Sequence, residues 1–121
     1  MKRILVVDDD KTITDLVKLM LETSGYGCTI ANSAKECLAV LHNNRFDLIL
    51  LDVAMPEVTG IDVMQKIKQD PALNNNKIVF FTASSFTDMQ IEDLKKQGIL
   101  DCIKKPFSKA RLLEAMGRYL D

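Results

Sequence analysis

The sequence has few of the residues that build redox, zinc or hydrolase sites. Its 121 residues include no tryptophan, one histidine and three cysteines. The cysteines, Cys28, Cys37 and Cys102, are odd in number and form no Cys-x-x-Cys pair, which argues against a disulfide framework and a zinc site. We expect small core residues in a reducing cytoplasm. We expect His42, near the end of a predicted helix, on the surface and outside any catalytic role.

An excess of charge of one sign and long apolar runs are also missing. The formal net charge of -1 gives no bulk attraction to nucleic acid or to a membrane surface. No apolar stretch approaches the roughly 20 residues of a membrane span. The run that follows Arg3 stops at Asp8, too early for the apolar region of a signal peptide. Neither of the common glycine-rich phosphate loops occurs, which excludes the usual nucleotide-binding signatures.

Short apolar runs alternate with helical periodicity along the whole chain. We expect strands at residues 3–8, 28–31, 46–51, 78–81 and 99–103, with a helix after each. Gly25 and Gly98 are placed to end two of the helices, and Ser33 with Glu36 is typical of a capping box. Five strands that alternate with five helices predict an α/β fold, a parallel sheet with helices on both faces. The length predicts one domain, residues 1–121.

Polar residues follow four of these strands where each strand ends. Asp8, Asp52, Thr82 and Lys105 lie at or just past the carboxyl ends of the first, third, fourth and fifth strands. In open parallel sheets, ligands bind outside the carboxyl ends of the strands. The pattern therefore predicts that these four residues share one pocket.

The chemistry of this set favours a hard cation and a phosphoryl group. Asp8, Asp9 and Asp52 offer oxygen ligands, which suit Mg²⁺ better than Zn²⁺. Lys105 supplies a second positive centre, and the Thr82 hydroxyl can donate a hydrogen bond to a phosphoryl oxygen. Asp52 stands singly at its strand end, so it is the better nucleophile, while the Asp8–Asp9 pair suits a metal.

Simpler interpretations exist for each residue. The three successive aspartates could be a polar turn that opens a helix, where acidic groups favour the helix dipole. Thr82 could be an ordinary strand residue, and we interpret Lys104 as a solvated charge before a helix that begins near a proline. The predicted convergence of Asp52 and Lys105 on the same edge favours the functional interpretation.

Four motifs, in this order and spacing, resemble the receiver (response-regulator) domain of two-component signalling, the CheY-like family. They are Val6-Val7-Asp8-Asp9, the run from Leu50 to Pro56 with Gly60, Thr82-Ala83, and Lys105-Pro106-Phe107. The resemblance covers essentially the whole chain. It implies a flavodoxin-like five-stranded parallel sheet of order 2-1-3-4-5, in a three-layer sandwich.

The resemblance also implies residue roles. Asp52 is then the phosphoacceptor, Thr82 and Lys105 contact the phosphoryl group, and the Lys105-Pro106 bond is cis. Asp9, Asp52 and the Ala54 carbonyl bind Mg²⁺, and Asp8 assists through water. Ala54 and Ser84 lie beside the phosphoryl group and influence its lifetime.

The implied partners are proteins. A phosphohistidine on a sensor histidine kinase or a histidine phosphotransfer protein is the donor. A downstream effector protein binds the face formed by the fourth helix, fifth strand and fifth helix. The chain itself is expected to make no direct contact with nucleic acid or a membrane. Such a domain catalyses only its own phosphorylation and dephosphorylation. Because no output domain follows the last helix, we expect a stand-alone regulator or a phosphorelay shuttle.

Two rival functions and one departure complete the sequence interpretation. A pseudo-receiver that only binds proteins is disfavoured by the intact Asp, Thr and Lys set. A small flavodoxin-like enzyme or flavin carrier is disfavoured, because no hydroxyl- and glycine-rich phosphate loop follows the first strand and the aspartates there would repel a flavin phosphate. The departure is Cys102, three residues before Lys105, where receiver domains often carry Tyr or Phe. We expect a muted or altered response on the face of the fourth helix and fifth strand.

Overall fold

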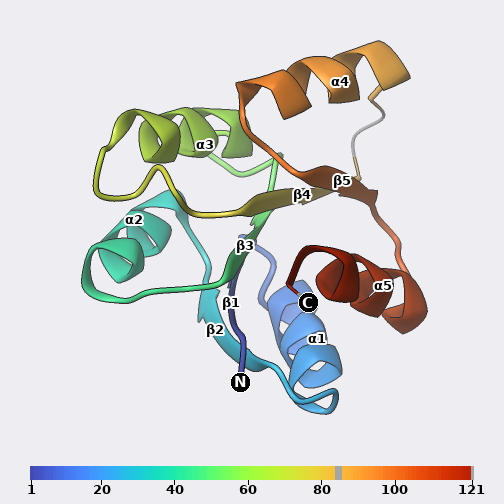
Figure 1. Cartoon of the computed structure of the whole chain (residues 1–121). Helices are drawn as coiled ribbons and strands as arrows, with labels where there is room; N and C mark the ends of the chain where they lie inside the picture. The colour runs from blue at the N-terminus through green and yellow to red at the C-terminus, as the bar shows by residue number, and fades with distance from the viewer. Residues whose placement is uncertain (84–85, 121) are drawn as a thin grey trace.

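The computed structural model describes residues 1–83 and 86–120. Within these ranges five strands alternate with five helices (Figure 1). The strands are β1 (Arg3–Val7), β2 (Gly27–Ala31), β3 (Leu48–Asp52), β4 (Ile78–Thr82) and β5 (Asp101–Lys104). The helices are α1 (Lys11–Glu22), α2 (Ala34–Asn43), α3 (Gly60–Gln69), α4 (Asp88–Gln97) and α5 (Lys109–Leu120).

The strands form one parallel sheet of order β2-β1-β3-β4-β5, which confirms the predicted fold. The register pairs Val7 with Leu51, Asp52 with Phe81, and Thr82 with Lys104. The carboxyl ends of β1, β3, β4 and β5 are therefore level with one another. This register brings the residues that follow or end these strands to one edge of the sheet.

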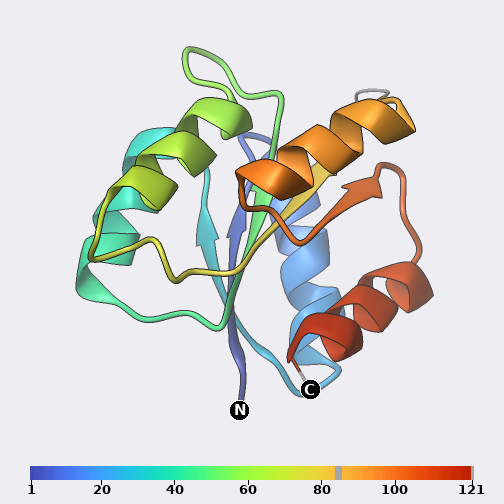
Figure 2. The ribbon, with the colours of Figure 1, turned by 45° about the horizontal axis from the view of Figure 1, so that its top comes forward.

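Alternation along the strands divides the interior into two cores. Leu5, Val7 and Leu51 pack under α2, α3 and α4, whereas Ile4 and Val6 pack under α1 and α5. Figure 1 shows these two helix layers on opposite faces of the sheet, and Figure 2 shows them after a 45° turn. All five strand residues are buried in β3 and in β4, as expected for central strands covered on both faces.

The element ends differ from the sequence prediction in a few places. Strand β3 begins at Leu48 and not at Phe46, because its pairing with β1 starts at Ile4 and Leu48. Asp47, just outside the strand, accepts the Arg3 backbone N–H with its carboxylate at 2.7 Å. Strand β5 likewise begins at Asp101, two residues later than predicted.

The helix caps are local and match their residue types. Ser33 caps α2 by accepting the Glu36 N–H, but the predicted capping box is incomplete because the Glu36 carboxylate accepts the N–H of Asn32. The complete box occurs at α4, where Thr87 and Gln90 bond each other reciprocally. No helix in the described part of the chain is long and apolar enough to cross a membrane.

Candidate functional site

The four residues predicted to share a pocket do lie at the same edge of the sheet. Asp8 directly follows β1, Asp52 ends β3, Thr82 ends β4, and Lys105 directly follows β5. Asp8, Asp52 and Thr82 are buried, with exposed fractions of 1%, 3% and 1%. Ordinary loop aspartates are solvated, so two buried carboxylates at one edge require compensating charge.

Lys105 supplies that charge. Its Nζ lies 2.5 Å from Asp8 Oδ2 and 3.4 Å from Asp52 Oδ1, so one ammonium group bridges the two carboxylates. The lysine backbone N–H donates to the carbonyl of Thr82 at 2.8 Å, which fixes it to the end of β4. The ammonium also lies 4.6 Å from the centre of the Phe81 ring, and the next peptide bond, to Pro106, is cis as predicted.

The Asp52 carboxylate is oriented by a backbone hydrogen bond and is poorly solvated. The Ala54 N–H donates to its Oδ1 at 3.3 Å. Burial, together with the charge of Asp8, raises the pKa of Asp52 from 3.8 to about 6, although Lys105 and the Ala54 N–H act in the opposite direction. A carboxylate in this state is ionised near neutral pH and accepts few hydrogen bonds, which leaves it available as a nucleophile.

The three successive aspartates do different things. Asp8 is buried against Lys105, and its Oδ1 also accepts the Asp10 N–H at 2.9 Å. Asp10 caps α1 by accepting the N–H groups of Thr12 and Ile13, so the simple helix-opening interpretation is correct for this residue alone. Asp9 is exposed at the mouth of the site.

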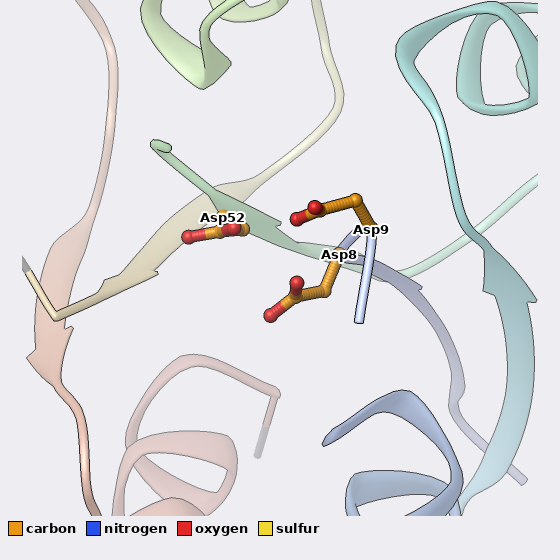
Figure 3. A group of neighbouring side chains, drawn as sticks. All are labelled: Asp8, Asp9 and Asp52. Atoms are coloured by element: carbon orange, nitrogen blue, oxygen red, sulfur yellow. The ribbon is translucent and has the colours of Figure 1, made fainter. Parts of the chain in front are cut away.

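Asp8, Asp9 and Asp52 could hold a divalent cation. Each offers a carboxylate oxygen, and these oxygens lie within 4.8 Å of one another. Figure 3 shows the three side chains side by side at the ends of β1 and β3. An all-oxygen set with one exposed side fits Mg²⁺, which keeps part of its water shell. The excess of carboxylates over the single Lys105 also leaves negative charge for a cation to neutralise.

Gly60 fixes the loop that returns from β3 to α3. A Cβ on this glycine would lie 2.2 Å from the backbone oxygen of Asp52 and 2.8 Å from Val53 Cα. Its N–H donates to the carbonyl of Val53 at 2.8 Å. Only a residue without a side chain permits this approach, so the glycine holds the backbone of Asp52 and Val53 against the start of α3.

Two residues of the site, Asn32 and Thr14, were not predicted from the sequence. Asn32 Nδ2 donates to the Asp8 carbonyl at 2.8 Å and to Thr14 Oγ1 at 3.1 Å, and Thr14 is fully buried. Asn32 therefore positions the backbone of Asp8 from the end of β2. Its signal was a polar residue directly after the β2 run, at the same sheet edge. Ser84, which the family resemblance placed beside the phosphoryl group, lies outside the described residues.

The comparisons with known proteins agree on one family. The family model described as the response regulator receiver domain matches residues 4–117. PhoB of Pseudomonas aeruginosa, a phosphate regulon transcriptional regulatory protein, is 36% identical over 112 residues, which cover 93% of this chain and 48% of PhoB. The chain spans about half the length of PhoB and of other curated relatives that it matches.

Solved structures agree with the fold. The chemotaxis protein CheY4 of Vibrio cholerae superimposes with a TM-score of 0.90 at 29% identity, over 99% of both chains. The response regulator TrrA of Thermotoga maritima, solved in complex with Mg²⁺ and BeF, has a TM-score of 0.84 at 32% identity. It is matched over 99% of this chain and 100% of its own.

Proposed function

Because the chain belongs to the response regulator receiver domain family of two-component signalling, we propose that it accepts a phosphoryl group on Asp52. The donor is a phosphohistidine of a sensor histidine kinase or of a histidine phosphotransfer protein. The observation that carries this proposal is the buried Asp52 carboxylate, 3.4 Å from the Lys105 ammonium and grouped with Asp8 and Asp9.

In the proposed transfer, an Asp52 carboxylate oxygen forms a bond to phosphorus. The bond from phosphorus to the donor's imidazole nitrogen breaks, and its electron pair stays on the imidazole. Lys105 then neutralises charge on a phosphoryl oxygen, and the Thr82 hydroxyl donates a hydrogen bond to another. The proposal therefore assigns Asp52 as nucleophile and Thr82 and Lys105 as the catalytic residues that contact the transferred group.

We also propose Mg²⁺ as the cofactor, held by Asp8, Asp9, Asp52 and the Ala54 backbone carbonyl. When bound, the ion neutralises negative charge on the phosphoryl oxygens. The 4.8 Å grouping of the three carboxylates supports this assignment. The solved complex of the related TrrA with Mg²⁺ and BeF is a further reason to test it.

The whole chain, residues 1–121, would act as one signalling domain. It would catalyse only its own phosphorylation and dephosphorylation, and an effector would bind on the face formed by α4, β5 and α5. We place this activity in the cytoplasm, and the free thiols of Cys28, Cys37 and Cys102 support a reducing compartment.

Intact-mass spectrometry tests the proposal. The protein is incubated with Mg²⁺ and acetyl phosphate, a small phosphoryl donor, and compared with Asp52→Asn. We expect one phosphoryl adduct on the unsubstituted protein and none on the variant. No adduct on either protein, together with no binding of beryllofluoride, would favour a protein-binding module without phosphotransfer.

A further inference from the structure

A groove separates α3 and α4 on the face of the sheet that also carries α2. It has a volume of about 550 Å³. Both views show α3 and α4 side by side on this face of the sheet (Figures 1 and 2). The groove is lined by Ile61, Gln65, Phe86, Met89, Gln90, Asp93, Leu94 and Gln97.

The groove is apolar at its base and along one rim. Leu94 is 5% exposed, and Ile61 and Phe86 are half-buried against the core. Met89 is 84% exposed, although it lies next to these apolar side chains. A large exposed methionine beside a hollow marks a surface that can adapt to an apolar partner, because the thioether side chain is flexible and polarisable.

The charged residues that line this groove and the adjoining hollow are mostly acidic. Asp93 is the charged residue among the described residues that line the groove, and its Oδ2 accepts a hydrogen bond from Gln97 at 2.9 Å. A smaller hollow of about 390 Å³ shares Met89 and Asp93 with the groove and is also lined by Asp88, Glu92 and Lys96. Three carboxylates and one lysine line this hollow, and Lys95 Nζ lies 3.8 Å from Glu92 Oε1.

The geometry favours a helical occupant over an extended one. The two walls of the groove are helices, whose backbone groups are bonded internally, so an extended segment would find no strand edge to pair with. A third helix satisfies its own backbone and can place side chains at i, i+3, i+4 and i+7 along the groove. The ten residues of α4 give a wall about 15 Å long, which matches about three turns of a partner helix.

We propose that the α3–α4 groove is a docking site for an amphipathic helix of a partner protein, with an apolar stripe flanked by basic residues. The stripe fills the hollow between Ile61, Phe86 and Leu94 and contacts Met89. The basic flank pairs with Asp93, Asp88 and Glu92. The groove itself lies between α3 and α4, and its described lining includes no residue of β5 or α5, which form part of the effector face assigned above. Docking there does not depend on phosphorylation of Asp52.

A peptide titration tests this site. The probe is a synthetic peptide of about 14 residues, with leucine at i, i+3, i+4 and i+7, alanine between, and lysine on one flank. Its control has glutamate in place of every lysine. Amide resonances of the full ¹⁵N-labelled chain are followed during both titrations.

We expect the shifts to concentrate on Ile61, Gln65, Met89, Asp93 and Gln97, with the basic peptide at least about tenfold tighter than the acidic one. Met89→Ser and Asp93→Asn should each weaken the basic peptide by about tenfold. Leu19→Ser, at a 61% exposed leucine on α1, should leave binding unchanged. Asp93→Asn should still take up the phosphoryl group from acetyl phosphate, which separates this site from the proposed function.

Four results would overturn the docking proposal. The first is no binding of the basic peptide at millimolar concentration. The second is equal binding of both peptides, and the third is a set of shifts that maps to α1. The fourth is concentration-dependent shifts of the groove residues without any peptide, which would assign the groove to a second copy of this chain.

Discussion

Asp52 is held between opposing electrostatic effects. Burial and the nearby Asp8 disfavour its charge, whereas Lys105 at 3.4 Å and the Ala54 N–H at 3.3 Å favour it. The balance raises its pKa to about 6. The carboxylate is therefore ionised at neutral pH, yet the fold is destabilised by keeping it so.

This balance predicts a pH-dependent stability. The pKa of Asp52 is about 6 in the folded protein, against 3.8 for an unperturbed aspartate side chain. The folded state therefore binds the proton more tightly, and the resulting stabilisation is complete below pH ~4 and lost as the pH rises through about 6. In EDTA, we expect Asp52→Asn to raise the free energy of unfolding by on the order of 2 kcal/mol at about pH 7.5 and to change it little near pH 4.

Urea denaturation at the two pH values measures this difference. Lys104→Ala, at an exposed lysine beside the site, is the control and should show no such change with pH. An equal effect of Asp52→Asn at both pH values would contradict the assignment of a raised pKa.

The place of a site residue in the fold was predictable where the residue lies at a strand end, but the distances between side chains were not. The positions of Asp8, Asp52, Thr82 and Lys105 follow from the lengths of apolar runs and the geometry of a parallel sheet. The closer pairing of Lys105 with Asp8, at 2.5 Å, depends on the path of the chain after β5. The role of Asn32 depends on its contact with the carbonyl of Asp8, 24 residues earlier, and its place after the β2 run indicates the sheet edge but not that contact.

Among the elements, the turn from β3 to α3 positions Asp52, the proposed nucleophile. This turn includes Asp52, Ala54 and Glu57. The φ of Glu57 is 70°, in the left-handed region. Gly60 closes this turn onto the carbonyl of Asp52. Gly60 was predictable from its motif, but the reason for a glycine there lies in a backbone approach that only the folded chain reveals.

Gly60→Ala tests the role of this turn. The new Cβ would overlap the Asp52 carbonyl at 2.2 Å, so the turn has to shift. We expect a loss of about 2–3 kcal/mol in the free energy of unfolding and a weaker affinity for Mg²⁺. Gly27→Ala is the matched control, because its Cβ would meet no atom nearer than 3.5 Å. A Gly60→Ala variant as stable as the Gly27→Ala variant would contradict the close approach.

Element order and type were predictable along the whole chain, whereas the exact ends were not. Buried strands read as apolar runs, and the helices follow with 3.6-residue spacing, so both patterns are strong. The start of β3 was placed two residues early because Phe46 extends the apolar run. In the fold, the Phe46 ring lies 5.0 Å from the Arg3 guanidinium and packs outside the ladder.

At the scale of the whole molecule, Cys102 lies on β5, three residues before Lys105, where the family resemblance led us to expect Tyr or Phe. It pairs with Phe80 in the β4–β5 register and packs partly against the core under α2, α3 and α4. Burial, with a contribution from Asp101, raises the pKa of its thiol, so it stays neutral. A thiol is smaller than an aromatic ring, and we therefore expect a muted or altered response of β5 to phosphorylation.

We expect beryllofluoride with Mg²⁺ to shift amide resonances strongly near Asp52, Thr82 and Lys105 but only weakly across residues 99–104. NMR titration of the ¹⁵N-labelled chain measures this. Cys102→Tyr is the matched variant, and its shifts should extend through β5 and into α4. Large shifts through residues 99–104 in the unsubstituted protein would show that the relay does not need an aromatic ring.

Borohydride trapping of the phosphorylated chain tests the central claim most directly. The reagent reduces an acyl phosphate on an aspartate side chain to the alcohol, which leaves homoserine, and peptide mass spectrometry then locates it. After reaction with acetyl phosphate and Mg²⁺, we predict homoserine at position 52 and unchanged aspartates at positions 8 and 9. Homoserine at position 8 or 9, or none at position 52 despite a phosphoryl adduct on the intact protein, would contradict the assignment of Asp52 as the phosphoacceptor.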